Sequence, residues 1–146
     1  MYVFVLTLHS YVRWAVLVLG LVALVMAWSA HFSRSRWTQP QANLGRLFSG
    51  VFDLQVLLGV LLYTWLSPVT TSAFRDMGAA MRNPSQRFFV AEHLLMMVVA
   101  AVLVHIGVAR ARKKDAPLQA AIFYTLAFVA VLAGIPWGQA PLFRGF

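Results

Sequence analysis

Four long apolar runs, separated by polar connections, make up most of this chain. They cover residues 3–32, 47–66, 88–109 and 118–137. A helix needs about 20 apolar residues to cross a hydrocarbon core roughly 30 Å thick, and each run is close to or above that length. Short connections make successive helices antiparallel neighbours. The pattern predicts an all-α, polytopic membrane protein, a single domain over residues 1–146 built as an up-down-up-down bundle of four transmembrane helices.

Composition agrees with a membrane protein and argues against a nucleic-acid-binding one. Hydrophobic residues make up 61% of the chain and charged residues 11%, whereas a soluble domain has about 25% charged residues. The net charge is +8, but most basic residues flank the apolar runs, where a bilayer explains them. We therefore expect lipid, and no nucleic acid, as a partner. The chain has no cysteine, which excludes disulfides, thiolate metal sites and c-type haem attachment.

The basic residues also predict an orientation. The first and third connections hold seven of them: Arg34, Arg36, Arg46, Arg110, Arg112, Lys113 and Lys114. The opposite side holds four, namely Arg75, Arg82, Arg87 and Arg144. Since loops rich in Lys and Arg stay in the cytoplasm, both termini are expected outside. The first run has no basic segment before it and is longer than the core of a signal peptide, so we interpret it as a retained helix.

Polar residues within the runs gather near the expected outer side. His9 and Arg13 lie four residues apart on one face of the first helix. Glu92 and His93 open the third helix, with Arg87 just before it. The first and third helices should run parallel, so His9 and His93 fall at similar depths. Imidazole is costly in lipid and normally faces the bundle interior, where it marks a cofactor, proton or ion site.

This pairing predicts a haem site. Haem b can be held by one neutral imidazole on each side of its iron, and helical bundles build such sites from inward-facing side chains. The propionates of haem need cationic or hydrogen-bonding partners, for which Arg13 and Arg87 are candidates. Glu92 is a candidate to orient a ligand histidine or to balance an arginine. We expect His9 and His93 as the iron ligands.

On the second helix, Gln55, Gly59 and Tyr63 recur every four residues and define one face. Gly59 can admit a flat macrocycle, with a hydrogen bond from Gln55 or Tyr63. Ordinary packing of small and polar residues between transmembrane helices is the alternative for this face.

A second polar layer, near the expected inner side, contains His31, Asp53 and His105. A carboxylate at the depth of Asp53 should be paired or neutral, and His31, His105 and Arg46 are its candidate partners. A structural ion pair and a proton relay through Asp53, His31 and His105 are both open interpretations. A second haem is disfavoured, because His93 and His105 are 12 residues apart and therefore some 120° apart around the helix. We expect one haem.

Four segments resemble a small bacterial family of four-helix membrane proteins commonly labelled cytochrome b-like. They are LHSYVRW at 8–14, QVLLGVLLY at 55–63, RFFVAEHLLMM at 87–97 and IPW at 135–137. The resemblance implies a b-type haem protein of the bacterial inner membrane, with His9 and His93 matching the motif histidines. Arg13, Gln55, Arg87 and Glu92 match its other polar positions.

These observations lead to one expected function and one alternative. The expected function is electron transfer by a membrane-bound b-type cytochrome, between quinone and a periplasmic or membrane redox protein. No hydride site, nucleotide loop or hydrolytic triad is recognisable, so an electron carrier or complex subunit is favoured over a stand-alone enzyme. The alternative is a haem-free accessory or assembly subunit, or a proton-relay protein.

Overall fold

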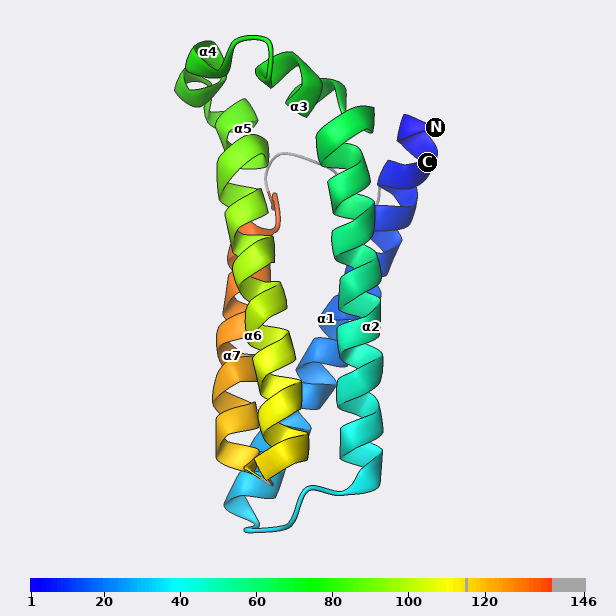
Figure 1. Ribbon diagram of the computed structural model, residues 1–146, viewed down its shortest axis with the longest axis vertical. Coiled ribbons are helices and arrows are strands. Elements are labelled where there is room, and N and C mark those ends of the chain that lie inside the picture. Colours follow the sequence, from blue (N-terminus) through cyan, green and yellow to red (C-terminus); the bar gives the residue numbers. More distant parts are fainter. Residues whose placement is uncertain (115, 138–146) are drawn as a thin grey trace.

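The computed structural model describes residues 1–114 and 116–137, and most of these residues lie in helices. Four helical segments are long and apolar enough to cross a membrane (Figure 1). They are α1 (Tyr2–Phe32), α2 (Gln39–Leu61) with the π-helical turn η1 (Leu62–Leu66), α6 (His93–Lys114) preceded by α5 (Pro84–Arg87) and the π-helical turn η2 (Phe88–Glu92), and α7 (Pro117–Gly134). Two short helices, α3 (Pro68–Ala73) and α4 (Met77–Arg82), connect η1 to α5. The predicted all-α membrane fold is confirmed.

The four long helices form a ring in which each packs against two neighbours. α1 contacts α2 and α7, and α6 contacts the same two helices. α1 and α6 therefore lie diagonally across the bundle, and both run from the end with α3–α5 towards the end with the α1–α2 connection (Figure 1). Side chains on the inner faces of α1 and α6 meet only across the middle of the bundle.

Local chemistry sets helix ends that differ from the ends of the apolar runs. α2 begins at Gln39, before the apolar run, because Thr38 caps it and Pro40 occupies its first turn. The Thr38 backbone N–H donates to Gln41 Oε1 at 2.7 Å. α7 ends at Gly134, before the end of its run, since Pro136 has no N–H to continue the ladder. The indole N–H of Trp137 donates instead to the Leu132 carbonyl at 2.8 Å.

The half of the bundle near the α1–α2 connection is closely packed. Its buried core is rich in alanine, which lets transmembrane helices approach closely. Three large side chains, Phe48, Phe52 and Tyr124, fill the remaining space and are each at most 2% exposed. The rings of Phe48 and Tyr124 meet edge to face with centres 5.9 Å apart. Beyond Phe52, towards α3–α5, the packing opens into a cavity.

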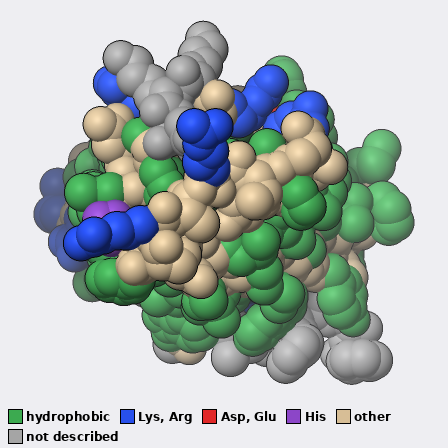
Figure 2. Space-filling model, turned by 90° about the horizontal axis from the view of Figure 1, so that it is seen from below, with side chains coloured by type: hydrophobic (Ala, Val, Ile, Leu, Met, Phe, Trp, Pro, Cys, Tyr) green, Lys and Arg blue, Asp and Glu red, His purple; other side chains and the backbone are tan. Residues whose placement is uncertain are grey.

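Arginines gather at the end of the bundle with the α1–α2 connection, called here the basic end. Figure 2 views the molecule from this end, with arginine side chains spread over it and hydrophobic side chains around the sides. The exposed arginines here are Arg34, Arg36, Arg46, Arg110 and Arg112. Large apolar side chains such as Val18, Leu57 and Val129 are more than half exposed along the helices. This distribution suits a lipid bilayer around the helices and water at the ends.

Candidate functional site

A cavity of about 310 Å³ lies between the four long helices in the half of the bundle towards α3–α5. Five residues of the predicted haem site line it: His9 and Arg13 from α1, Gln55 and Gly59 from α2, and His93 from α6. Apolar side chains supply most of the remaining lining. A mostly apolar cavity with a few convergent polar groups is typical of a cofactor or small-molecule site.

The two histidines face each other across this cavity from diagonal helices. Their ring centres are 6.4 Å apart, and the ring planes are inclined by 72°. Two metal–imidazole bonds of about 2 Å each, lengthened by the distance from each nitrogen to its ring centre, separate two ring centres by roughly 6 Å. The observed separation is close to this value.

The end of α7 fixes the orientation of His93. Its Nδ1 lies 2.6 Å from the carbonyl oxygen of Gly134. Because α7 ends at Gly134, this carbonyl has no acceptor role within the helix, and Nδ1–H can donate to it. That hydrogen bond sets the tautomer and leaves the lone pair on Nε2. Metal-ligating histidines commonly donate their other ring N–H to a backbone carbonyl in this way.

His9 is held from α2. Its Nε2 lies 3.2 Å from Nε2 of Gln55, which is 6% exposed. Among the residues that the structure describes, His9 Nδ1 and Gln55 Oε1 are buried without a hydrogen-bond partner. If the side-chain amide of Gln55 is turned by about 180°, its Oε1 takes the place of its Nε2. His9 Nε2–H then donates to Gln55 Oε1, and the lone pair of His9 lies on Nδ1. Each histidine thus has one nitrogen held by the protein and a second that no described residue uses.

Gly59 brings the backbone of α2 close to His9. A Cβ at this position would lie 3.3 Å from His9 Cε1, so a larger side chain would crowd the imidazole and occupy the cavity. Arg13 lines the same cavity one turn below His9, and its guanidinium carbon lies 5.8 Å from the centre of the Trp14 ring. Arg13 supplies a cation beside an otherwise apolar space.

Arg87 and Glu92 lie outside the lining of the cavity. Arg87 Nε donates to Glu92 Oε1 at 2.7 Å, and both side chains are nearly half exposed. The π-helical turn η2 between them explains this pair, because its wider turn brings residues five apart onto one side. Glu92 therefore balances an arginine, one of its two predicted roles, and Arg13 is the predicted propionate partner that lines the cavity.

Several cavity residues were not predicted from the sequence as site residues. They include Ser10, Phe52, Phe89, Val131 and Pro136. Tyr63 also lines the cavity, and its hydroxyl donates to the Val90 carbonyl at 3.0 Å, which ties η1 to η2. The most important group that the sequence did not predict is the Gly134 carbonyl, which contacts His93. Pro136, two residues later, is the signal that could have pointed to a helix end there.

The second polar layer has a different geometry. Asp53 Oδ1 and His105 Nε2 are 2.9 Å apart, and their side chains are 55% and 53% exposed, so the pair faces away from the bundle interior. His31 is not part of this pair; its ring lies 5.9 Å from that of Trp28. The proton relay through Asp53, His31 and His105 stays a prediction.

We expect Asp53 and His105 to stabilise helix contact as a unit. If one of them is replaced with leucine, the other faces hydrocarbon without its hydrogen-bond partner. Asp53→Leu and His105→Leu should therefore each lower the free energy of unfolding by about 0.6–1.7 kcal/mol. The double variant removes both polar groups and should recover most of that loss. Thermal stability of the four proteins in detergent measures the coupling. Additive losses in the double variant would contradict a stabilising pair.

In the described part of the chain, no group of three or more His, Asp or Glu side chains is arranged to hold a metal ion. A haem would need only two side chains to hold its iron, so this absence does not bear on the pair His9 and His93. No protein-family model, curated protein or solved structure matches this chain.

Proposed function

We propose that this protein is a membrane-bound, b-type cytochrome-like electron carrier that holds one haem b between α1 and α6. The observation that carries the proposal is the pair His9 and His93. Their imidazoles line a mostly apolar cavity from opposite sides, and their ring centres are 6.4 Å apart. The resemblance of the segments around both histidines to cytochrome b-like proteins supports the same function.

The chain's own groups divide the work of such a site. His9 and His93 would hold the haem iron, and Gln55 and the Gly134 carbonyl hold the two rings. Hydrogen bonds to ligand histidines raise their basicity and so lower the reduction potential of the metal. The absence of a side chain at Gly59 leaves room for the His9 imidazole against α2. Haem bound in this way supplies one-electron chemistry.

Arg13 and the apolar lining would both act on the electrostatics of the site. Arg13 can bind a propionate through its guanidinium fork, which anchors the cofactor near one end of the cavity. Its positive charge favours the reduced state of the site. The apolar side chains exclude water and raise the strength of every electrostatic interaction inside. The protein thus sets the potential through ligand orientation, one fixed cation and burial.

We also propose the setting in which this function operates. The protein would reside in a bacterial inner membrane, with the basic end in the cytoplasm and the end with α3–α5 in the periplasm. The haem site then lies in the periplasmic half of the membrane. Electrons would pass between quinone in the bilayer and a membrane or periplasmic redox protein.

An absorption spectrum tests the proposal directly. The purified full-length protein, expressed with adequate haem supply, should show a sharp Soret band, and dithionite reduction should produce split α and β bands of a low-spin haem. Two imidazole ligands give this low-spin signature. Pyridine haemochrome analysis should return one haem b per chain.

A well-folded protein that stays colourless after haem is added would reject the cytochrome function. The alternative would then stand, a haem-free accessory subunit or a proton-relay protein. The hydrogen-bonded pair of Asp53 and His105 is the observation that favours this alternative, because ionisable groups at this depth often serve proton transfer.

A further inference from the structure

A second pocket, of about 270 Å³, opens at the basic end between the start of α2 and the end of α6. Its residues fall into an apolar set and a polar set. The apolar set is Trp37, Ala42 and Ala111, and the polar set includes Gln39, Arg46 and Arg112. Ala111 belongs to the buried core of the bundle and Trp37 packs against that core, so the apolar floor of the pocket is held by the bundle.

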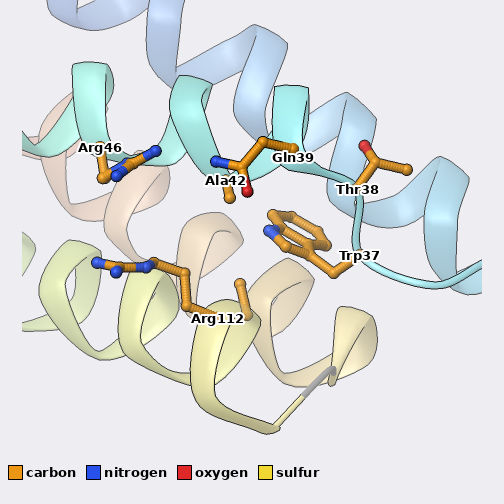
Figure 3. Close-up of a pocket in the computed structure, with 7 residues that line it drawn as sticks. Trp37, Thr38, Gln39, Ala42, Arg46 and Arg112 are labelled. Carbon is orange, nitrogen blue, oxygen red and sulfur yellow. The ribbon is translucent and has the colours of Figure 1, made fainter.

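Two arginines from different helices meet at this pocket. Figure 3 shows Arg46 extending from α2 and Arg112 from α6 on one side of the pocket, with the Trp37 ring on the other. Neither arginine forms an ion pair with a carboxylate that the structure describes. Among the described residues, Glu92 is in contact with Arg87 and Asp53 is in contact with His105. Two like charges that converge without a counter-charge favour binding of an anion.

Neighbouring polar groups position one of these arginines and leave most of its donors free. The side-chain oxygen of Asn43 accepts hydrogen bonds from Arg46 and from the Gln39 amide. A guanidinium has five N–H donors in a planar fork, so one bond to Asn43 leaves the others for a ligand. Arg46 is thereby held in a defined direction towards the pocket.

The position of the pocket along the helices indicates the boundary between lipid and water. Arg46 and Arg112 each lie seven residues nearer the basic end than the paired Asp53 and His105 (53 − 46 = 7 and 112 − 105 = 7). Seven residues of helix span about 10 Å. The helices beyond this level are apolar, and tryptophan, here Trp37, is favoured where hydrocarbon meets headgroups.

We propose that this pocket binds the phosphodiester headgroup of an anionic phospholipid. The guanidinium forks of Arg46 and Arg112 match phosphate oxygens in geometry and charge. The glycerol segment of the lipid packs on Trp37, Ala42 and Ala111, which a free anion would leave uncovered. An anionic lipid is preferred over a zwitterionic one, whose own ammonium group would lie near two guanidinium groups. Basic pockets between transmembrane helices are suited to such headgroups.

Native mass spectrometry of the full-length protein in detergent tests this proposal. Phosphatidylglycerol and phosphatidylcholine with the same acyl chains are the probes, and phosphatidylglycerol should bind more tightly. The double variant Arg46→Gln/Arg112→Gln should lose affinity for phosphatidylglycerol by about tenfold or more, since charge-assisted hydrogen bonds are removed. The control is Arg75→Gln/Arg82→Gln, which removes the same charge at the opposite end and should bind like the parent protein.

Two further measurements distinguish a lipid site from a site for a free anion and from the absence of a site. Inorganic phosphate that displaces phosphatidylglycerol at a similar concentration would assign the pocket to a free anion and overturn the lipid proposal. Equal binding of phosphatidylglycerol by the Arg46/Arg112 double variant and the parent protein would overturn the site itself. The variant Arg46→Lys/Arg112→Lys keeps the charge without the planar fork, so it should bind with intermediate affinity. It also provides the comparison if the glutamine variant does not fold.

Discussion

Replacing either His9 or His93 with alanine should abolish the bound chromophore of the purified protein. In the proposed site each imidazole would help to hold the haem iron, and the two rings face each other across the cavity with their centres 6.4 Å apart. Loss of one ring leaves a gap that no other described His, Asp or Glu side chain lining this cavity can fill. Absorption spectra of the oxidised and reduced variants, taken at equal protein concentration, measure the effect.

His31→Ala is the matched control, because His31 lies outside the cavity lining and packs beside Trp28 and Phe32 on α1. It removes the same side chain from the same kind of helix and should keep the full spectrum. Circular dichroism of all three variants should show the same helix content. If His9→Ala and His93→Ala both keep the parent spectrum, the ligand assignment is wrong.

Gly107→Val should destabilise the bundle by about 1–3 kcal/mol or more, because it overpacks a core that cannot relax. A Cβ at Gly107 would lie 2.7 Å from Cε1 of Tyr124. The Tyr124 ring has little room to retreat, since its hydroxyl approaches Gly45 on α2 and its face meets Phe48. The fraction of protein that stays monodisperse after heating in detergent, read by size-exclusion chromatography, gives the loss of stability.

Gly50→Val is the control for the intrinsic effect of valine in a helix. A Cβ at Gly50 meets no heavy atom within 4 Å, so the same substitution creates no clash there. The difference between the two variants isolates overpacking against Tyr124. Equal thermal stability of both variants would show that the α6–α7 contact tolerates the added volume.

The sequence by itself determined the membrane fold. Backbone polar groups must be satisfied within each segment in lipid, so four apolar runs of sufficient length leave little choice but four helices. The same reasoning fixed the depth of the polar residues. Seven residues were predicted to form one site. Five of them, His9, Arg13, Gln55, Gly59 and His93, line one cavity, whereas Arg87 and Glu92 lie outside its lining. Depth along a straight helix follows from residue number alone, because the rise per residue is constant.

Other features were decided only by tertiary structure. Asp53 had three candidate partners at its depth, and the rotation of α2 and α6 about their axes selected His105, on a face directed outward. Arg87 and Glu92 meet because η2 departs from regular α-helical geometry, which spacing rules assume. The Gly134 carbonyl reaches His93 from 41 residues away. Helix rotation, a local change of helix type and contacts between distant segments depend on how side chains pack together, and periodicity along one chain does not encode that packing.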